Sequence, residues 1–260
     1  MGGLYGLRMV LFAKKRGRLV KSQSTWQGRN GVAIGALLSL ACVAAQAVTV
    51  VVPGKSNPNL AGRASDYTCC SGDSVALHAP ILVTGLPLLA GQSLTFAVSG
   101  RVSHTGSATP GDNPDGDLYV GAPSNYGVGI TAPTGVNRIN ALVGVFLSDA
   151  APAAANTPAP LSFASGLGFL SLSPLIGQQF FIGNGLTGDT NTGDHGGQVQ
   201  TFAVPSGATR LYLGTSDGFG WYNNSGAFTV GVAAVPEPAT FALVLAGALT
   251  LLGRRRQSLH

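Results

Sequence analysis

The sequence contains few charged residues and few of the patterns that build long helices. Lysine and arginine take 15 positions and aspartate and glutamate 10, so charged residues make up 10% of the 260, while Gly takes 38 and Pro 15. This composition excludes a helical bundle or coiled coil, which needs periodic runs of Ala, Glu, Lys and Leu. Intrinsic disorder is also excluded, because 45% of the residues are hydrophobic. The length allows one domain of about 200 residues or two small ones.

The charges are divided unevenly along the chain. Seven of the 15 basic residues fall in the first 47 residues, which contain no acid, and three form the cluster 254–256. The stretch 48–235 keeps five basic residues and nine of the ten acids, all aspartate, which leaves a formal charge of −4. The whole-chain charge of +5 therefore comes from the two ends. Nucleic-acid binding needs clustered Lys and Arg against phosphates, so we expect none.

The N-terminal segment is typical of a secretory signal peptide. A basic stretch precedes an apolar run over 32–45, which ends in the small-x-small sequence Ala45-Gln46-Ala47. This order predicts cleavage by signal peptidase after Ala47, so we assign residues 1–47 as the signal peptide. The basic part is long, and Met9 is an alternative start. A helix of a folded domain is the alternative interpretation, although the apolar run has no polar face.

The C-terminal segment, residues 235–260, has three ordered parts. The motif Pro236-Glu237-Pro238 precedes an apolar run over 239–252, and three arginines follow at 254–256. The run is shorter than the about 20 residues of a full membrane span, and a simple membrane anchor is the alternative interpretation. The basic cluster is expected to stay on the cytoplasmic side.

These three parts together resemble the PEP-CTERM sorting signal. In that family the tail holds the protein at the inner membrane until an exosortase cuts near the Pro-Glu-Pro motif. The resemblance implies a transient inner-membrane anchor through residues 239–252, followed by release to the cell surface or extracellular matrix. Exosortase systems accompany exopolysaccharide production in Gram-negative bacteria. The resemblance therefore also implies a Gram-negative source and extracellular polysaccharide as a partner.

Cysteine is scarce, and only Cys69 and Cys70 remain after the expected loss of the signal peptide. Export leads to an oxidising compartment. There, adjacent cysteines can form a disulfide with each other or pair between chains. No other Cys or nearby His accompanies them, so a zinc site is not expected.

The middle of the chain, residues 48–234, shows the short alternating segments of a β-protein. Apolar residues recur with a period of two, and Gly, Pro, Asn and Asp clusters separate the segments. Residues 141–147 are apolar on both faces, as expected of a central strand. The predicted strands cover 48–52, 94–99, 141–147, 199–204, 211–213 and 228–233. The sequence predicts an all-β fold, a single antiparallel jelly-roll-like β-sandwich.

The richest polar loop of this domain spans residues 215–226, between two predicted strands. It offers the carboxylate of Asp217 and the side-chain carbonyls of Asn223 and Asn224. Such oxygens are the ligands that Ca²⁺ prefers. Trp221 and Tyr222 add rings that can stack on a sugar. An ordinary hairpin loop is the alternative interpretation, because Asn-Asn-Ser-Gly is a favourable turn sequence.

The stretch 217–231 resembles the C-terminal loop and strand of small calcium-dependent galactose-binding bacterial lectins. The resemblance implies a jelly-roll-like sandwich with a bound calcium that contacts two sugar hydroxyls. The implied calcium ligands are the side chains of Asp217, Asn223 and Asn224 and the backbone carbonyl of Trp221. The loop is one residue shorter than in that family.

Two upstream segments extend this resemblance. The segment 91–104 matches a glycine-led strand, which implies a further calcium ligand from the backbone carbonyl of His104. The sequence Asn113-Pro114-Asp115-Gly116 matches a sugar-contacting loop that reads His-Pro-Asp-Gln in the lectins. The match implies ligand contacts from Asn113 and Asp115. Because the His and Gln are replaced, galactose specificity does not carry over.

Catalytic patterns are scarce. The sequence contains no Gly-x-Ser-x-Gly elbow and no His-Glu-x-x-His pair, and nothing pairs two carboxylates as in a glycosidase. We therefore do not expect an enzyme. Calcium is the cofactor expected from the loop 215–226 and from its resemblance to the lectins. A structural matrix protein without a ligand is the main alternative, and a hydrolase built on Asp194-His195 is the third hypothesis.

Overall fold

The described part of the chain is an all-β domain, as predicted. The computed structural model describes residues 46–70, 72–106, 111–119, 121–188 and 197–235, together with Gly247. The predicted signal peptide up to residue 45, the motif at 236–238 and the pair at 194–195 lie outside the described residues. Both flanking helices that we predicted fall there too. Within the described part, no helix is long and apolar enough to cross a membrane.

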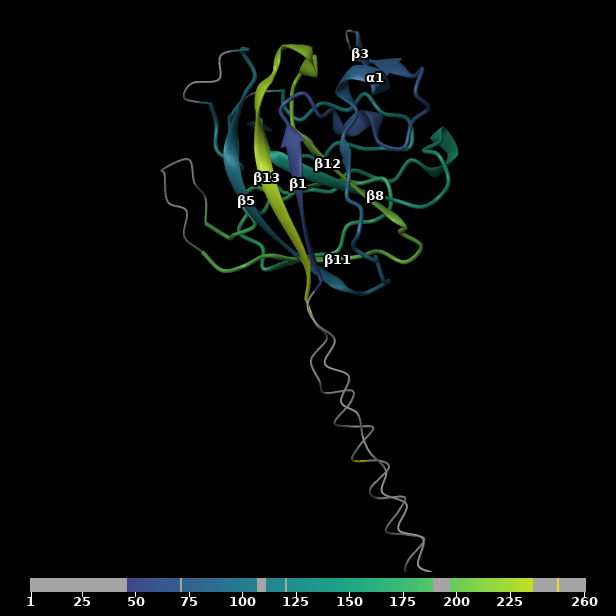
Figure 1. Ribbon diagram of the computed structural model, residues 1–260, viewed down its shortest axis with the longest axis vertical. Coiled ribbons are helices and arrows are strands. Elements are labelled where there is room, and N and C mark those ends of the chain that lie inside the picture. The colour runs from purple at the N-terminus through teal and green to yellow at the C-terminus, as the bar shows by residue number, and fades with distance from the viewer. Residues whose placement is uncertain are drawn as a thin grey trace, which may run out of the picture. The chain divides into compact units, whose positions relative to one another are not determined.

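Two sheets form the sandwich (Figure 1). The first has the strand order β1-β13-β5-β11-β9 and the second β10-β8-β12-β4. Neighbouring strands are antiparallel except β11 and β9, which are parallel. The first sheet contains β1 (Ala47–Pro53), β5 (Ser93–Ser103), β9 (Ser171–Leu172), β11 (Thr201–Ala203) and β13 (Ser225–Ala234). The second contains β4 (Ile81–Leu82), β8 (Leu142–Leu147), β10 (Gln179–Phe181) and β12 (Arg210–Thr215).

Short elements occupy the connections between the main strands. Two small ladders pair β2 (Thr68–Cys69) with β3 (Asp73–Ser74) and β6 (Asp117–Leu118) with β7 (Arg138–Ile139). The helical turns are α1 (Val75–His78), η1 (Pro58–Leu60), η2 (Ala154–Asn156) and η4 (Trp221–Asn223). Each spans three or four residues, which agrees with the lack of helical periodicity in the sequence.

The core lies between the inner faces of the two sheets. On β13, Phe228, Val230 and Val232 are buried while Thr229 between them is exposed, so the period of two in the sequence is confirmed. These side chains belong to one apolar cluster with residues of β8 and β12, among them Phe146. Burying such a side chain contributes about 1.5–3 kcal/mol. The core therefore fixes which face of each strand points inward.

The central strand β8 is buried on both faces, as its continuous apolar sequence predicts. One face contributes Leu142 and Phe146 to the core between the sheets. The other contributes Val145 and Leu147 to a second cluster with Ile130. A loop layer therefore covers the outer side of this sheet, which explains the lack of polar alternation in β8.

The first and last strands determine where the ends of the domain lie. β1 and β13 are antiparallel, with Ala47 opposite Ala233 and Pro53 opposite Ala227. The two ends of the domain are therefore side by side, and the loop that precedes β13 lies at the other end of the same strands (Figure 1). A seven-residue strand separates these two ends by about 20 Å.

Candidate functional site

The loop between β12 and β13 is held closed by a buried tryptophan. Trp221, in η4, has only 1% of its surface exposed. Its ring Nε1 donates a hydrogen bond to the Thr215 carbonyl (2.7 Å), at the point where β12 ends. The indole thus ties the far side of the loop to its beginning. The ring is not available to a sugar, so our expectation that Trp221 stacks on a ligand is wrong.

Residues 121–126 support the same loop from the side. The Ser124 N–H donates to the Asp217 carbonyl (3.0 Å). The hydroxyls of Ser124 and Tyr126 both donate to the Gly218 carbonyl, at 2.6 and 2.8 Å. Within the loop, the Phe219 N–H donates to Asp217 Oδ1 (3.0 Å). These bonds fix the Asp217 carboxylate in place before any ligand binds.

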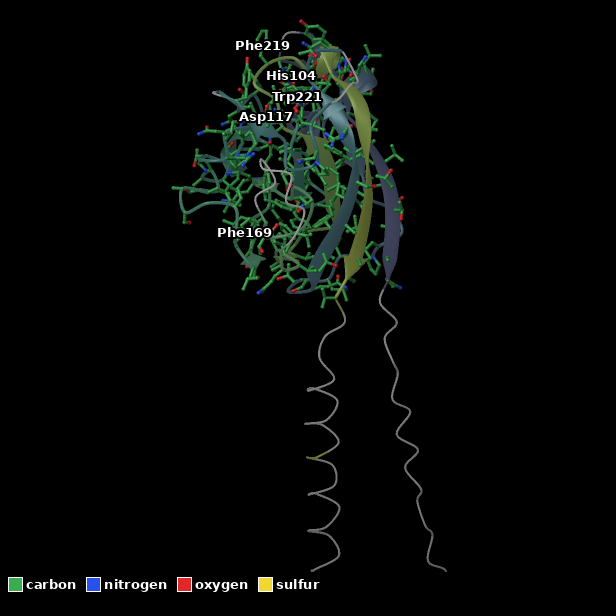
Figure 2. All side chains as sticks on the ribbon, turned by 90° about the vertical axis from the view of Figure 1, so that its left-hand side faces the viewer. His104, Asp117, Phe169, Phe219 and Trp221 are labelled. Atoms are coloured by element: carbon green, nitrogen blue, oxygen red, sulfur yellow. A yellow bond between two sulfur atoms is a disulfide. The ribbon has the colours of Figure 1, made fainter. Side chains whose placement is uncertain are left out.

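The strand register brings His104 to this loop from 120 positions earlier in the sequence. In the β5–β13 ladder, Ser103 lies opposite Ser225. The next positions outward are therefore His104 on one strand and Asn224 on the other. Figure 2 shows His104 at the same end of the domain as Trp221 and Phe219. The predicted fifth ligand position thus lies beside the loop that carries the other four.

Two buried side-chain oxygens of this loop have no hydrogen-bond donor among the described residues. Asp217 is 4% exposed and Asn224 1% exposed. By hydrogen-bond geometry Asp217 Oδ2 has no partner among the described residues, although the Asn224 side chain is near enough to lower the Asp217 pKa as a hydrogen-bond donor. Asn224 Oδ1 has no partner there either, and Asn224 Nδ2 donates to the Gly54 carbonyl (3.0 Å). Buried polar atoms are nearly always paired, so such a pair of acceptors needs an explanation. A bound cation supplies one.

The electrostatics of Asp217 point the same way. Burial raises the pKa of the Asp217 carboxyl above its ordinary value of 3.8. Hydrogen bonds from the Phe219 N–H, the Asn224 side chain and the Gly218 N–H, together with His104, lower the pKa of Asp217 without cancelling this rise. The carboxylate is therefore costly to hold in its charged form when nothing positive binds it. The same result places Asn224 and His104 within electrostatic reach of Asp217.

Asn140 holds the surroundings of His104 together. Its Nδ2 lies 3.1 Å from His104 Nδ1 and donates to Asp112 Oδ2 (2.6 Å), and its N–H donates to the Ser216 carbonyl (2.7 Å). Asn140 is fully buried with a φ of 61°, a left-handed conformation that Asn tolerates better than most residues. No sequence motif singled out this residue, which stands just before the apolar segment 141–147.

The second predicted ligand loop comprises residues 113–116, and one of its side chains, that of Asp115, is buried. Asn113 Oδ1 accepts the N–H of Asp115 (3.0 Å), which closes a local turn. Asp115 is buried, and its Oδ1 accepts the N–H of Asn184 (2.8 Å). Asp115 therefore offers little surface to a sugar. Asp117, by contrast, is exposed at the same end of the domain (Figure 2).

Exposed rings surround the loop in place of the buried indole. Tyr222 is 52% exposed and Phe219 60% exposed. The Phe219 ring packs edge-on against Tyr126, with ring centroids 6.5 Å apart. Asn223, the remaining predicted calcium ligand, is exposed, whereas Asn224 is buried. Phe219 was not among the predicted site residues, although its place between two glycines favours an exposed loop tip.

A second buried carboxylate links the loop to the cysteine hairpin. Asp73 Oδ2 accepts the N–H of Trp221 (2.9 Å) and the Nδ2 of Asn57 (3.1 Å), and its Oδ1 lies 3.3 Å from His78 Nδ1. Cys69 and Cys70 form a disulfide with each other, and the Asn57 amide also contacts both sulfurs. The hairpin β2–β3 is therefore part of the support of η4, a role that spacing in the sequence did not indicate.

The described residues offer oxygens rather than a classical transition-metal cluster. No group of three or more His, Cys, Asp or Glu that could hold a metal ion occurs among them. The predicted ligands near the start of β13 are one carboxylate, two amide carbonyls and two backbone carbonyls. That set suits a hard cation such as Ca²⁺.

Comparison with known proteins identifies the C-terminal end of the chain. Residues 234–257 match the PEP-CTERM protein-sorting motif. A search of curated proteins found no match to the chain. The motif supports an exosortase-processed protein that is exported and sorted to the bacterial cell surface, as the order of Pro-Glu-Pro, apolar run and arginines predicted.

Proposed function

We propose that the β-domain of this exported surface protein is a calcium-dependent carbohydrate-binding module. The observation that carries the proposal is the pair of buried, unpartnered oxygens, Asp217 Oδ2 and Asn224 Oδ1, beside His104. A cation between them would satisfy both acceptors and offset the buried negative charge. The resemblance of this loop and of the His104 strand to calcium-dependent lectins supports the same proposal.

In the proposed site, the side chains of Asp217 and Asn224 and the carbonyl of His104 hold calcium, with Asn223 and the Trp221 carbonyl as the remaining ligands. Calcium keeps open coordination positions that vicinal sugar hydroxyls can fill. The Asn113 turn and Tyr222 complete the edges of the sugar site. Asp115 supports the turn by accepting the hydrogen bond from the Asn184 N–H and does not contact the sugar.

We further propose how the flanking segments serve this module. Signal peptidase cleaves after Ala47 during export, and residues 239–252 hold the chain at the inner membrane for a time. An exosortase then cuts near Pro236-Glu237-Pro238 and releases the module to the exopolysaccharide matrix. Extracellular polysaccharide is the proposed ligand.

Calorimetric titration of the full chain with calcium tests the metal site. We expect saturable binding to the wild type and loss of at least tenfold in affinity in Asp217→Asn, which keeps the side chain's shape and removes its charge. The matched control is Asp149→Asn, because Asp149 is exposed and lies outside the site. Equal calcium binding by wild type and Asp217→Asn would contradict the proposal.

A glycan array probed with calcium and with EDTA tests the carbohydrate function. Binding to a glycan with calcium that disappears in EDTA supports the proposal. A blank array under both conditions would favour the alternative of a structural matrix protein without a ligand.

A further inference from the structure

A shallow groove of about 470 Å³ lies directly beside the proposed calcium site. Its walls come from the end of β1 and the residues after it, from Gly106, and from η4 and the start of β13. They include Pro53, Lys55, Tyr222, Asn223 and Asn224. Asn224 therefore belongs to both the proposed calcium site and the groove.

Lys55 is fixed at the rim by the residue that precedes it. The Gly54 N–H donates to the Gly226 carbonyl (3.0 Å), which continues the β1–β13 ladder. The Gly54 carbonyl accepts hydrogen bonds from Asn224 Nδ2 (3.0 Å) and from Thr215 Oγ1 (2.7 Å). The backbone that carries Lys55 is thus bonded directly to a proposed calcium ligand.

No described residue of the domain neutralises the positive charge of Lys55. Its side chain is exposed and makes no hydrogen bond or ion pair with a described residue. Arg63, Arg101 and Arg210 instead donate to backbone carbonyls, and Arg138 is buried. None of the described residues that line the groove is acidic. The groove is therefore a local positive site on a domain whose formal charge is −4.

We infer that this groove binds a sugar unit that carries a carboxylate, such as a uronic acid in an acidic polysaccharide. Lysine is a compact charge that pairs with one anionic group, and Tyr222 offers an exposed ring for a sugar face. The described lining of the groove contains no arginine, whose bidentate fork favours phosphate recognition. The inference rests on the proposed carbohydrate function and names its ligand class.

The test compares trigalacturonic acid with its methyl ester, which keeps the rings and removes the charges. Binding of each to the full chain is measured by calorimetry at one calcium concentration. We expect Lys55→Gln to weaken binding of the acid about tenfold, as for the loss of one charge-assisted hydrogen bond. Binding of the ester is expected to stay within twofold. Tyr222→Leu is expected to weaken both ligands equally, because stacking does not sense the charge.

Arg101→Gln is the matched control, since Arg101 is an exposed cation outside the groove. The inference is overturned if the wild type binds acid and ester equally, if it binds neither, or if Lys55→Gln and Arg101→Gln weaken the acid to the same extent. A calcium titration without sugar separates this result from the proposed function. Lys55→Gln is expected to bind calcium as the wild type does. Absent calcium binding together with a selective Lys55 effect would contradict the calcium site and leave the groove assignment standing.

Discussion

At the scale of single residues, burial decides which side chains can serve the proposed site. Asp217, Asn224 and His104 were named from the sequence, and the structure brings them to one end of the domain. The sequence could not show that the Trp221 ring is buried or that Asn140 holds His104 and Asp112 together. Both facts depend on contacts between distant segments, which local patterns do not contain.

The raised pKa of Asp217 predicts opposite effects of Asp217→Asn with and without calcium. In EDTA, the metal-free fold favours the neutral carboxyl. The stability that the neutral Asp217 carboxyl contributes is complete below its ordinary pKa of 3.8. This stability is lost as the pH rises through the raised pKa of the folded state. The melting temperature of the wild type is therefore expected to fall relative to that of Asp217→Asn as the pH rises from about 4 to 7. Thermal melts in EDTA over that range measure the difference.

Saturating calcium is expected to raise the melting temperature of the wild type above that of Asp217→Asn at neutral pH, because only the wild type gains binding energy from the cation. The same melts repeated with calcium provide this comparison. A wild type that melts above Asp217→Asn in EDTA at every pH would contradict the account of a costly buried carboxylate.

At the scale of elements, the period of two in the sequence was enough to predict the main strands. It did not predict which strands pair with each other in the sheets. The alternation in β5, β12 and β13 reflects one buried face per strand, so it is visible locally. The pairing of Ser103 with Ser225 is a property of the ladder, and the support of η4 by the β2–β3 hairpin arises from one buried carboxylate. Neither the pairing nor this support can be read from a local sequence pattern.

Replacing Asp73 with alanine is expected to destabilise the domain by about 3 kcal/mol. The substitution leaves the Trp221 N–H and the Asn57 amide without their buried acceptor, and it removes the partner of His78. Urea unfolding of both proteins measures the free energy of unfolding. Asp66→Ala serves as the control, since Asp66 is exposed near the same hairpin and its loss is expected to cost about 0.5 kcal/mol or less. Equal stabilities of the two variants would contradict the supporting role of Asp73.

The junction of β1 and β13 depends on a residue without a side chain. A Cβ atom on Gly54 would lie 2.6 Å from the Ser225 carbonyl oxygen and 2.8 Å from Val102 Cγ1. Gly54→Ala is therefore expected to cost about 2 kcal/mol of stability and to weaken calcium binding, because the Gly54 carbonyl positions Asn224. Urea unfolding and calcium titration measure the two effects.

Gly168→Ala is the control for this substitution, since a Cβ there would meet its nearest atom at 3.6 Å. Gly168→Ala is expected to change neither the free energy of unfolding nor the calcium affinity. Wild-type calcium affinity in Gly54→Ala would show that the β1–β13 junction does not position the site.

At the scale of the whole molecule, the segment that matches the sorting motif begins at Ala234, at the opposite end of the β1–β13 strand pair from the proposed binding site. The domain's two ends meet where Ala47 pairs with Ala233, whereas the site lies beyond Pro53 and Ser225. The bonds that shape the site come from within the domain. Binding is therefore expected to be independent of processing at the C-terminal motif.

Substituting alanine for Pro236, Glu237 and Pro238 tests this independence. We expect the variant chain to accumulate uncut in the membrane fraction and to bind calcium with the affinity of the wild type. Asp217→Asn is expected to show the converse, with normal processing and weakened calcium binding. Cell fractionation with immunoblotting follows processing, and calorimetry follows binding. A calcium affinity that changes together with processing would contradict a self-contained module.

A crystal structure of the protein grown with calcium tests directly whether the Asp217 loop binds the cation. We expect one cation at the start of β13, about 2.3–2.6 Å from Asp217 Oδ2, Asn224 Oδ1 and the His104 carbonyl oxygen. Asp217 Oδ2 bonded to a protein donor or a water, with no cation beside it at millimolar calcium, would contradict it.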